Sequence, residues 1–572
     1  MPCLHRGEAV TRQVTAIVSS TLTDAIFLKT LTATLGPQLS IVIHTMRLVT
    51  VLKTDTAKQY RWHSFKEQGS NPYTAKKLSC YERRIYMLDF LKKEANLKYT
   101  ENGAVTHAAS ESFCLDLFFG AGAMRGTEEK EIGRAVIRAY AEDPVKTLKI
   151  IFFARDVRGG LGERRFFKAA VKALSYTAPE AVNRNIPLFA EYGRYDDLLV
   201  LFHTPCEDTA VKEISNILYA DTRAMKNGEK VSLIAKWLPS VNTSSNLARM
   251  QGKYLCKKLG MSEKEYRKTL SALRTYCDII ENRLRIGDYT FDYEKQASGA
   301  LFKYRAAFLR NDGERYVSYI NAVCGGKAKM NTSSLYPYDI VRACLTGTGE
   351  GERKALDAAW KNLPDIGADS NALAVVDGSG SMTWSRSGAV RPIDAALSLG
   401  IYFAGHNKGR FANHFITFSE TPKLVEIKGG DIYEKTRYCA SFNEVANTNL
   451  EAVFSLILKT AVKNRVKQSE MPERLYIISD MEFDSCVVGG NNDTMFNAMK
   501  KQYKKYGYSL PQIVFWNVNA RQNNFPVTRA QTGAALVSGF TPALFDMVCS
   551  GDISPEKVMD NILSGERYAA VV

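Results

Sequence analysis

Residues 371–382 read NALAVVDGSGSM, in which an apolar run ends at Asp377 and two serines, Ser379 and Ser381, follow at alternate positions. The intervening glycines let the turn be tight, and the alternation directs both hydroxyls toward one side. One anionic and two neutral oxygens suit a hard cation such as Mg²⁺, which prefers oxygen ligands. Turns of Asp, Gly and Ser are common, so an ordinary capping turn is the alternative interpretation of this motif alone.

Two further oxygen ligands are predicted in loops beside other apolar elements. Thr448 lies in NTNLEAVF, just before a long amphipathic stretch, and Asp480 directly follows the apolar run in YIISDMEFD, where Glu482 and Asp484 add carboxylates nearby. Loops at the carboxyl ends of parallel strands meet at one edge of a sheet. The predicted site for Mg²⁺, or for another divalent cation, therefore consists of Asp377, Ser379, Ser381, Thr448 and Asp480.

Residues 366–572 have the pattern that such a site requires. Short β-rich apolar runs alternate with amphipathic helices, which is typical of a doubly wound, mainly parallel sheet of the Rossmann type. In such sheets ligands bind beyond the carboxyl ends of the strands, where the strand order reverses. The expected strands are 372–376, 415–419, 423–427, 474–479, 512–518 and 534–538, and the expected helices are 393–406, 449–464 and 494–506.

Residues 76–365 are mostly helical by pattern, because apolar residues recur there at i, i+3 and i+4. Short connections use Gly, Pro, Asn or Asp, so a domain built from helical repeats is expected. Residues 347–354 are interpreted as a linker, and residues 1–75 form an N-terminal extension to which no role is assigned. The expected helices are 146–157, 163–174, 178–192, 193–202, 208–225, 228–237, 244–259, 262–284 and 337–346.

The positive charge of the chain is concentrated before residue 371. The net charge is +16, of which residues 1–370 carry about +14 and residues 371–572 about +2. A polyanionic partner is therefore expected on the helical domain, although a mildly basic surface that only confers solubility is the alternative.

Cysteine usage points to a reducing compartment. The 11 cysteines are an odd number and none forms a CxxC motif, which predicts reduced thiols and a cytoplasmic protein. The most apolar stretch, residues 39–52, is too short for a membrane span and contains His44 and Arg47, so no membrane association is expected.

The five predicted ligands resemble, in type and in order, the metal-ion-dependent adhesion site of von Willebrand factor A domains. In that family Asp-x-Ser-x-Ser is followed by a loop Thr and then by an Asp at the end of a strand. The resemblance implies an ion with one open position, which an acidic group of a partner completes. This chain departs from the family pattern at Met481, where many such domains have Gly.

A helical domain followed by a von Willebrand A-like domain resembles the Ro autoantigen (TROVE) family. A domain family of unknown function with the same layout is more similar, on the stretches TENGAVTHAASESFCLDLFFGAGAMRG, FFARDVRGGLGERRFF, YGRYDDLL, KWLPSVNTSS and YIISDMEFD. Ro proteins are rings of HEAT-like repeats that bind small noncoding RNAs and the single-stranded ends of defective RNAs. The resemblance implies RNA binding only through the more distant Ro family.

Basic residues of the motif ARDVRGGLGERR are the first candidates for RNA contact. Its arginines surround three glycines, and arginine grips phosphates with two donors. The alternative is that Asp156 and Glu163 pair with these arginines and fix a turn between two helices. The stretch 266–285 also mixes arginine with tyrosine, as single-strand binders do and as solvated helix faces do. The candidate residues are Arg155, Arg158, Arg164, Arg165, Lys168 and Lys236.

The sequence thus predicts a protein that binds RNA and is not an enzyme. It contains no GxSxG, GxxxxGK[ST] or HExxH motif. The alternative function is a protein-interaction scaffold, in which the metal ion captures an acidic residue of a protein partner.

Overall fold

The computed structural model describes residues 96–365, 371–383, 390–419, 421–443, 449–484, 494–520, 522–548 and 553–572. All described residues belong to one compact unit, which lies within residues 88–572. The predicted N-terminal extension therefore lies outside the described residues. Every described helix is too short or too polar to cross a bilayer.

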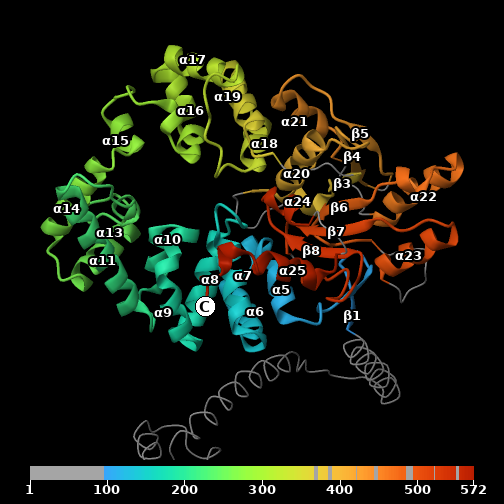
Figure 1. The fold of residues 1–572 in the computed structure, drawn as a ribbon, viewed down its shortest axis with the longest axis horizontal. Helices are drawn as coiled ribbons and strands as arrows, with labels where there is room; N and C mark the ends of the chain where they lie inside the picture. Colours follow the sequence, from blue (N-terminus) through green and yellow to red (C-terminus); the bar gives the residue numbers. More distant parts are fainter. Residues whose placement is uncertain are drawn as a thin grey trace, which may run out of the picture. The chain divides into compact units, whose positions relative to one another are not determined.

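Residues 96–365 form a hairpin followed by a row of helices (Figure 1). The hairpin consists of β1 (Leu97–Tyr99) and β2 (Val105–His107), which pair antiparallel. Neighbouring helices pack on one another, as α6 does on α8 and α16 on α17. The helices are α5 (Phe113–Ala121), α6 (Glu129–Glu142), α7 (Pro144–Arg155), α8 (Arg164–Thr177), α9 (Pro179–Asn185), α10 (Phe189–Tyr192), α11 (Glu207–Lys226), α12 (Ile234–Trp237), α13 (Asn246–Lys258), α14 (Glu263–Tyr276), α15 (Ile280–Arg285), α16 (Ser298–Asn311), α17 (Gly313–Cys324), α18 (Pro337–Thr346) and α19 (Glu350–Lys361).

Local capping explains where several of these helices begin. Asp143 precedes α7, accepts a hydrogen bond from the Lys146 amide at 2.9 Å, and is followed by Pro144 in the first turn. Ser262 precedes α14 and accepts a hydrogen bond from the Glu265 amide at 3.2 Å. The acidic residues of that first turn also stabilise the helix, because their negative charge interacts with the positive end of the helix dipole.

Several expected elements in this part differ from the structure, including the single helix expected over 178–192, which is divided into α9 and α10. The single helix predicted over 262–284 is interrupted, because Asp278 adopts a left-handed conformation with φ of 48° between α14 and α15. The helix expected over 228–237 is reduced to α12, and residues 195–201 form a 3₁₀ helix. The supposed linker 347–354 contains the first turn of α19.

Residues 371–572 form a mainly parallel six-stranded sheet, as predicted. The strand order is β5-β4-β3-β6-β7-β8, and only β4 and β5 pair antiparallel. The strands are β3 (Ala372–Asp377), β4 (His414–Phe418), β5 (Leu424–Glu426), β6 (Arg474–Ser479), β7 (Gln512–Asn517) and β8 (Ala534–Ser538).

Helices cover both faces of this sheet (Figure 1). On one face α20 (Pro392–His406) and α24 (Ala543–Met547) meet, and the ring of Phe545 lies 4.9 Å from that of Phe403 and 4.6 Å from that of Trp516. On the other face lie α22 (Leu450–Asn464) and α23 (Met495–Lys505), where the Tyr503 hydroxyl donates to the Phe454 carbonyl at 3.0 Å. Both β3 and β6 are buried along their whole length, as expected for central strands.

The motif ARDVRGGLGERR joins the first helices to the sheet part. The carboxylate of Asp156 is fully buried, and it accepts hydrogen bonds from Arg567 Nη2 at 2.7 Å, from Arg567 Nε, and from the Tyr568 hydroxyl at 3.1 Å. Gly160 permits this turn, because a Cβ at that position would overlap the Phe153 carbonyl. The motif therefore anchors residues 566–572 on the helical part.

The last helices of the row also contact the sheet part. α18 packs on α20 and on α21 (Ile432–Ala440), and α19 packs on α21. Arg353 of α19 forms ion pairs with Asp431 at 2.7 Å and with Glu434 at 3.1 Å. The row of helices thus begins and ends on the sheet part.

The Asp156 junction predicts a stability difference between two arginine variants. Arg567→Ala should lower the free energy of unfolding by about 2 kcal/mol, because it leaves the buried Asp156 without its charged partner. Arg529→Ala is the matched control, since Arg529 forms a 3.8 Å ion pair with Glu556 at the surface and should cost less than about 0.5 kcal/mol. Urea denaturation measures both, and equal losses would contradict the assigned role of Asp156.

Candidate functional site

The strand order reverses between β3 and β6, and two aspartates lie where these strands end. Asp377 is the last residue of β3, and Asp480 directly follows β6. The adjacent strands pair in parallel, so their carboxyl ends lie at the same edge of the sheet. This edge is where doubly wound sheets bind ligands.

Both aspartates are fully buried, which is unusual for two like charges. Asp377 Oδ1 accepts a hydrogen bond from the Ser379 amide at 2.9 Å, and Oδ2 accepts one from Ser479 Oγ at 2.6 Å. Burial and the neighbouring charge of Asp480 raise the pKa of Asp377 to about 7. A cation between the two carboxylates would offset both effects.

Both serines of the DGSGSM motif accompany Asp377. The hydroxyls of Ser379 and Ser381 lie 3.0 Å apart, and Ser379 is 4% exposed. The structure therefore brings Asp377, Ser379 and Ser381 onto one turn, with Asp480 on the adjacent loop. Thr448 lies outside the described residues. Carboxylate and hydroxyl oxygens form a donor set that fits a hard divalent cation.

Ser479 of this edge was not predicted from the sequence, and the conformation of Met481 was not predicted either. Ser479 donates its hydroxyl hydrogen to Asp377 and accepts from the Met481 amide at 3.1 Å, so it holds both loops together. Met481 adopts a left-handed conformation with φ of 64°. Glycine would reach this conformation without strain, whereas methionine adopts it at a cost. The only sequence signal for Ser479 was its place before Asp480.

Glu482 binds the N-terminal hairpin, although it was expected near the metal. Its carboxylate is buried and accepts hydrogen bonds from the Glu101 amide and from Asn524 Nδ2, each at 2.8 Å. Thr100 Oγ1 donates to the Phe483 carbonyl at 2.6 Å, and Asn102 Nδ2 donates to the Glu482 carbonyl at 2.7 Å. The stretch TENGAVTH therefore fixes the loop that follows Asp480.

Arg155 lies inside the protein, which is a correction to the predicted RNA-contacting set. Its side chain is 2% exposed and its Nε forms an ion pair with Asp197 at 2.7 Å, so it offers no surface to RNA. The alternative interpretation expected Asp156 and Glu163 to pair with arginines of the motif. Both form ion pairs with arginines, but these arginines lie outside the motif. Asp156 pairs with Arg567, and Glu163 accepts from Arg125 Nη2 at 2.6 Å.

The other five candidates lie nearer the surface and have intramolecular partners. Four form ion pairs and Arg165 donates to the Arg125 carbonyl at 3.1 Å. The four ion pairs are Arg158 with Glu191 at 3.2 Å, Arg164 with Asp196, Lys168 with Asp197 at 3.8 Å, and Lys236 with Glu281 at 3.1 Å.

The excess positive charge of the described helical part lies elsewhere. Residues 223–310, here called the basic segment, contain 18 Lys and Arg against 8 Asp and Glu. Residues 96–222 contain 16 against 18, and residues 311–365 contain 7 against 7. The net positive charge of the basic segment therefore exceeds that of the described helical part as a whole, because residues 96–222 are net negative and residues 311–365 are neutral.

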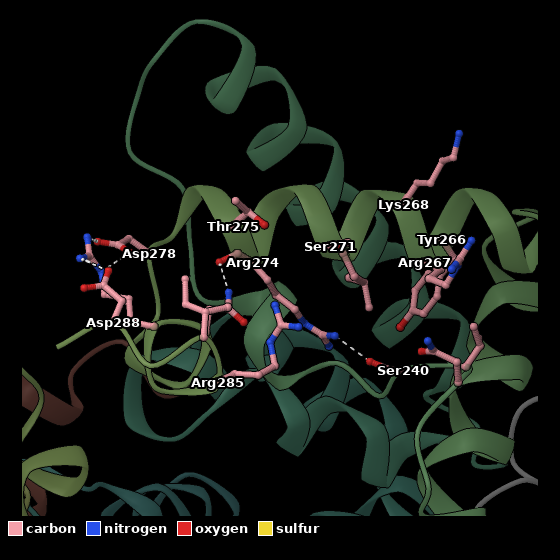
Figure 2. A pocket seen from close by; sticks show the side chains of 16 residues that line it. Ser240, Tyr266, Arg267, Lys268, Ser271, Arg274, Thr275, Asp278, Arg285 and Asp288 are labelled. Atoms are coloured by element: carbon pink, nitrogen blue, oxygen red, sulfur yellow. Dashed lines mark hydrogen bonds and ion pairs between the residues drawn. The ribbon is translucent and has the colours of Figure 1, made fainter. Parts of the chain in front are cut away.

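A cavity of about 660 Å³ opens in the basic segment, between α14, α15 and the loop at Ser240 (Figure 2). Five cationic and two acidic side chains line it. Arg283 binds both acids, Asp278 at 2.5 Å and Asp288 at 3.0 Å. Three other lining cations are exposed and form no ion pair within the part of the chain that the structure describes: Arg267, Lys268 and Arg285.

Arg274 is the fifth cation of this cavity, and uncharged groups hold it. Its guanidinium donates to the Ala235 and Leu238 carbonyls at 2.7 and 2.8 Å and to Ser240 Oγ at 2.6 Å. Burial lowers the pKa of Arg274, which shows the cost of keeping this charge away from water.

Two family models match consecutive parts of the chain, and the comparisons with known proteins give no activity. A family model described as a domain of unknown function (DUF2828) matches residues 100–227 and 212–369, and another so described (DUF7788) matches residues 371–566. An uncharacterized protein, L728, of Acanthamoeba polyphaga mimivirus is 28% identical over 512 residues, covering 82% of this chain and 87% of that protein. The crystal structure of the Deinococcus radiodurans Ro (RSR) protein gives a TM-score of 0.31 at 14% identity, covering 78% of this chain and 93% of that one.

The geometry at the sheet edge predicts that Ser479 stabilises both loops. Ser479→Ala should lower the free energy of unfolding by about 2 kcal/mol, because a buried carboxylate and a buried amide each lose a partner. Ser398→Ala is the control, since Ser398 is equally buried but donates only to the helical carbonyl of Ala395. It should cost less than about 1 kcal/mol. Equal losses in urea denaturation would contradict the role given to Ser479.

Proposed function

We propose that the protein binds RNA through the basic segment, residues 223–310. The observation that carries this proposal is the net positive charge of that segment together with three exposed cations that have no ion-pair partner among the described residues. Cations that are not neutralised within the protein attract phosphates and release their counterions. Arginine also stacks on bases and donates to phosphates with two nitrogens.

The proposed site lies on α13 to α16, where the sequence stretch 266–285 mixes arginine with tyrosine. Arg158, Arg164 and Lys168 remain near the surface, but binding RNA would require their ion pairs to open. Lys236 belongs to the basic segment, but it also forms an ion pair, with Glu281, which RNA binding would require to open. The resemblance to Ro proteins supports the same function. The protein in this proposal is a cytoplasmic binding protein and not an enzyme.

We also propose that the sheet part is a von Willebrand A-like domain that holds Mg²⁺. Two buried carboxylates and two hydroxyls at the strand-order reversal support this proposal. Asp377, Ser379, Ser381 and Asp480 would hold the ion, with Thr448 as the fifth ligand of the family pattern. Such an ion has an open coordination position, which an acidic residue of a protein partner can fill. A metal-dependent interaction scaffold is therefore the second candidate function.

RNA binding predicts a steep dependence of affinity on salt. If four cations contact single-stranded RNA, affinity should fall about 50-fold between about 50 and about 200 mM salt. The double variant Arg267→Ala/Lys268→Ala should weaken binding and reduce the logarithmic salt slope by about 1.4. Fluorescence anisotropy with a labelled single-stranded RNA measures both quantities.

The matched control removes two exposed cations outside the basic segment. Lys172→Ala/Arg184→Ala changes the net charge equally and should leave the salt slope within about 0.3 of the original, because neither residue contacts the RNA. RNA binding that is independent of salt, or equal losses in both double variants, would contradict the proposed site.

The metal proposal predicts a stabilisation that depends on Asp377. Mg²⁺ at about 100 times its dissociation constant should stabilise the protein by about 2.7 kcal/mol, visible as a rise in Tm. Asp377→Asn should abolish this rise, because it removes one of the two buried carboxylates that would hold the ion. Asp208→Asn, a change on an exposed side chain, should retain the rise.

Chelation separates the two candidate functions. EDTA should leave RNA binding unchanged and should abolish capture of an acidic protein partner. A rise in Tm with Mg²⁺ that persists in Asp377→Asn would contradict the metal site.

A further inference from the structure

We propose that the cavity between α14 and α15 binds the terminal phosphate of a phosphorylated nucleotide. This inference rests on the proposed RNA-binding function and names the chemical group that this cavity binds. The ligand is a phosphomonoester, which either the end of an RNA strand or a free mononucleotide can supply.

Arg274 gives the cavity a fixed donor that is not fully used. A guanidinium has five N–H donors, and three hydrogen bonds hold this one to Ala235, Leu238 and Ser240. None of these partners is charged, so the cation has no counter-ion among the described residues, although burial makes that costly. The Ser240 hydroxyl accepts from Arg274 and therefore keeps its own hydrogen for another acceptor. An anion in the cavity would accept hydrogen bonds from both the Arg274 guanidinium and the Ser240 hydroxyl.

Arg285 supplies a second donor from the other helix. Figure 2 shows the side chains of Arg274 and Arg285 reaching into the same space. Two arginines on separate elements can grip the oxygens of one phosphate from two directions. Ile286, next to Arg285, also lines the cavity and is 69% exposed, which provides an apolar contact for the sugar or base.

The charge of the cavity fits a terminal phosphate better than an internal one. The two acids of the lining, Asp278 and Asp288, are both bound by Arg283, so four further cations remain without a carboxylate partner in the lining. A phosphomonoester carries about −1.5 to −2 charges at neutral pH, whereas an internal phosphodiester carries only one. The volume of about 660 Å³ is also suitable for a nucleotide.

The test compares single-stranded RNAs of one sequence that differ only at their ends. One carries a phosphate at the 5′ end, one carries a phosphate at the 3′ end and one carries hydroxyls at both ends, and adenosine monophosphate serves as the free nucleotide. The full chain should bind one of the phosphorylated RNAs about tenfold more tightly than the hydroxyl RNA. Arg285→Ala should reduce this preference to less than about twofold.

Arg310→Ala is the matched control, because Arg310 is an exposed cation of the basic segment that does not line the cavity. It should weaken binding of all RNAs equally and keep the preference for the phosphorylated end. A preference of the same size in Arg285→Ala, or no preference in the unmodified protein, would overturn the inference while RNA binding itself stands.

The free nucleotide separates the remaining outcomes. Binding of adenosine monophosphate that requires Arg285, without binding of any RNA at low salt, would support the cavity and contradict the proposed RNA-binding function. Absence of binding for all RNAs and for the nucleotide would overturn both proposals.

Discussion

The buried carboxylate of Asp156 holds the helical part and the sheet part together. It lies in the turn between α7 and α8, yet its partners Arg567 and Tyr568 are more than 400 residues away in sequence. A fully buried carboxylate is tolerated only when charged and hydroxyl donors satisfy it. This junction and the Arg353–Asp431 contact fix both ends of the row of helices. The basic segment lies between these two fixed points.

A second set of buried carboxylates organises the edge of the sheet. Asp377 and Asp480 lie at the strand-order reversal, and Ser479 links their loops through hydrogen bonds. Glu482 extends this set to the hairpin at 97–107. The loop that follows Asp480 therefore contacts the first described residues of the helical part. Metal binding and the docking of that hairpin share the loop after β6.

The sequence predicted much of the fold because the relevant signals are local. The apolar runs at 474–479 and 534–538 coincide with β6 and β8, and 337–346 coincides with α18. Asp377 and the two serines were also found, because a turn after a strand brings them together without distant partners. The interruption of the helix at Asp278 was not predicted, because the neighbouring residues give no signal for a left-handed conformation.

Contacts between distant residues were not predictable from one sequence. Nothing in the sequence distinguishes the environment of Arg155 from that of Arg285. Arg155 is buried in an ion pair with Asp197, whereas Arg285 is exposed and has no ion-pair partner among the described residues. The motif with the densest arginines therefore proved to be a junction. By sequence alone, the mixed stretch 266–285 is equally typical of a solvated helix face, and only the fold places its cations around one cavity.

The most direct test of the account is to photo-crosslink a thiouridine-containing single-stranded RNA to the full chain and to identify the crosslinked peptides by mass spectrometry. RNA binding by the basic segment predicts crosslinks within residues 223–310, including α14. Crosslinks confined to residues 155–168 or to the sheet part would contradict the central claim that the basic segment binds RNA.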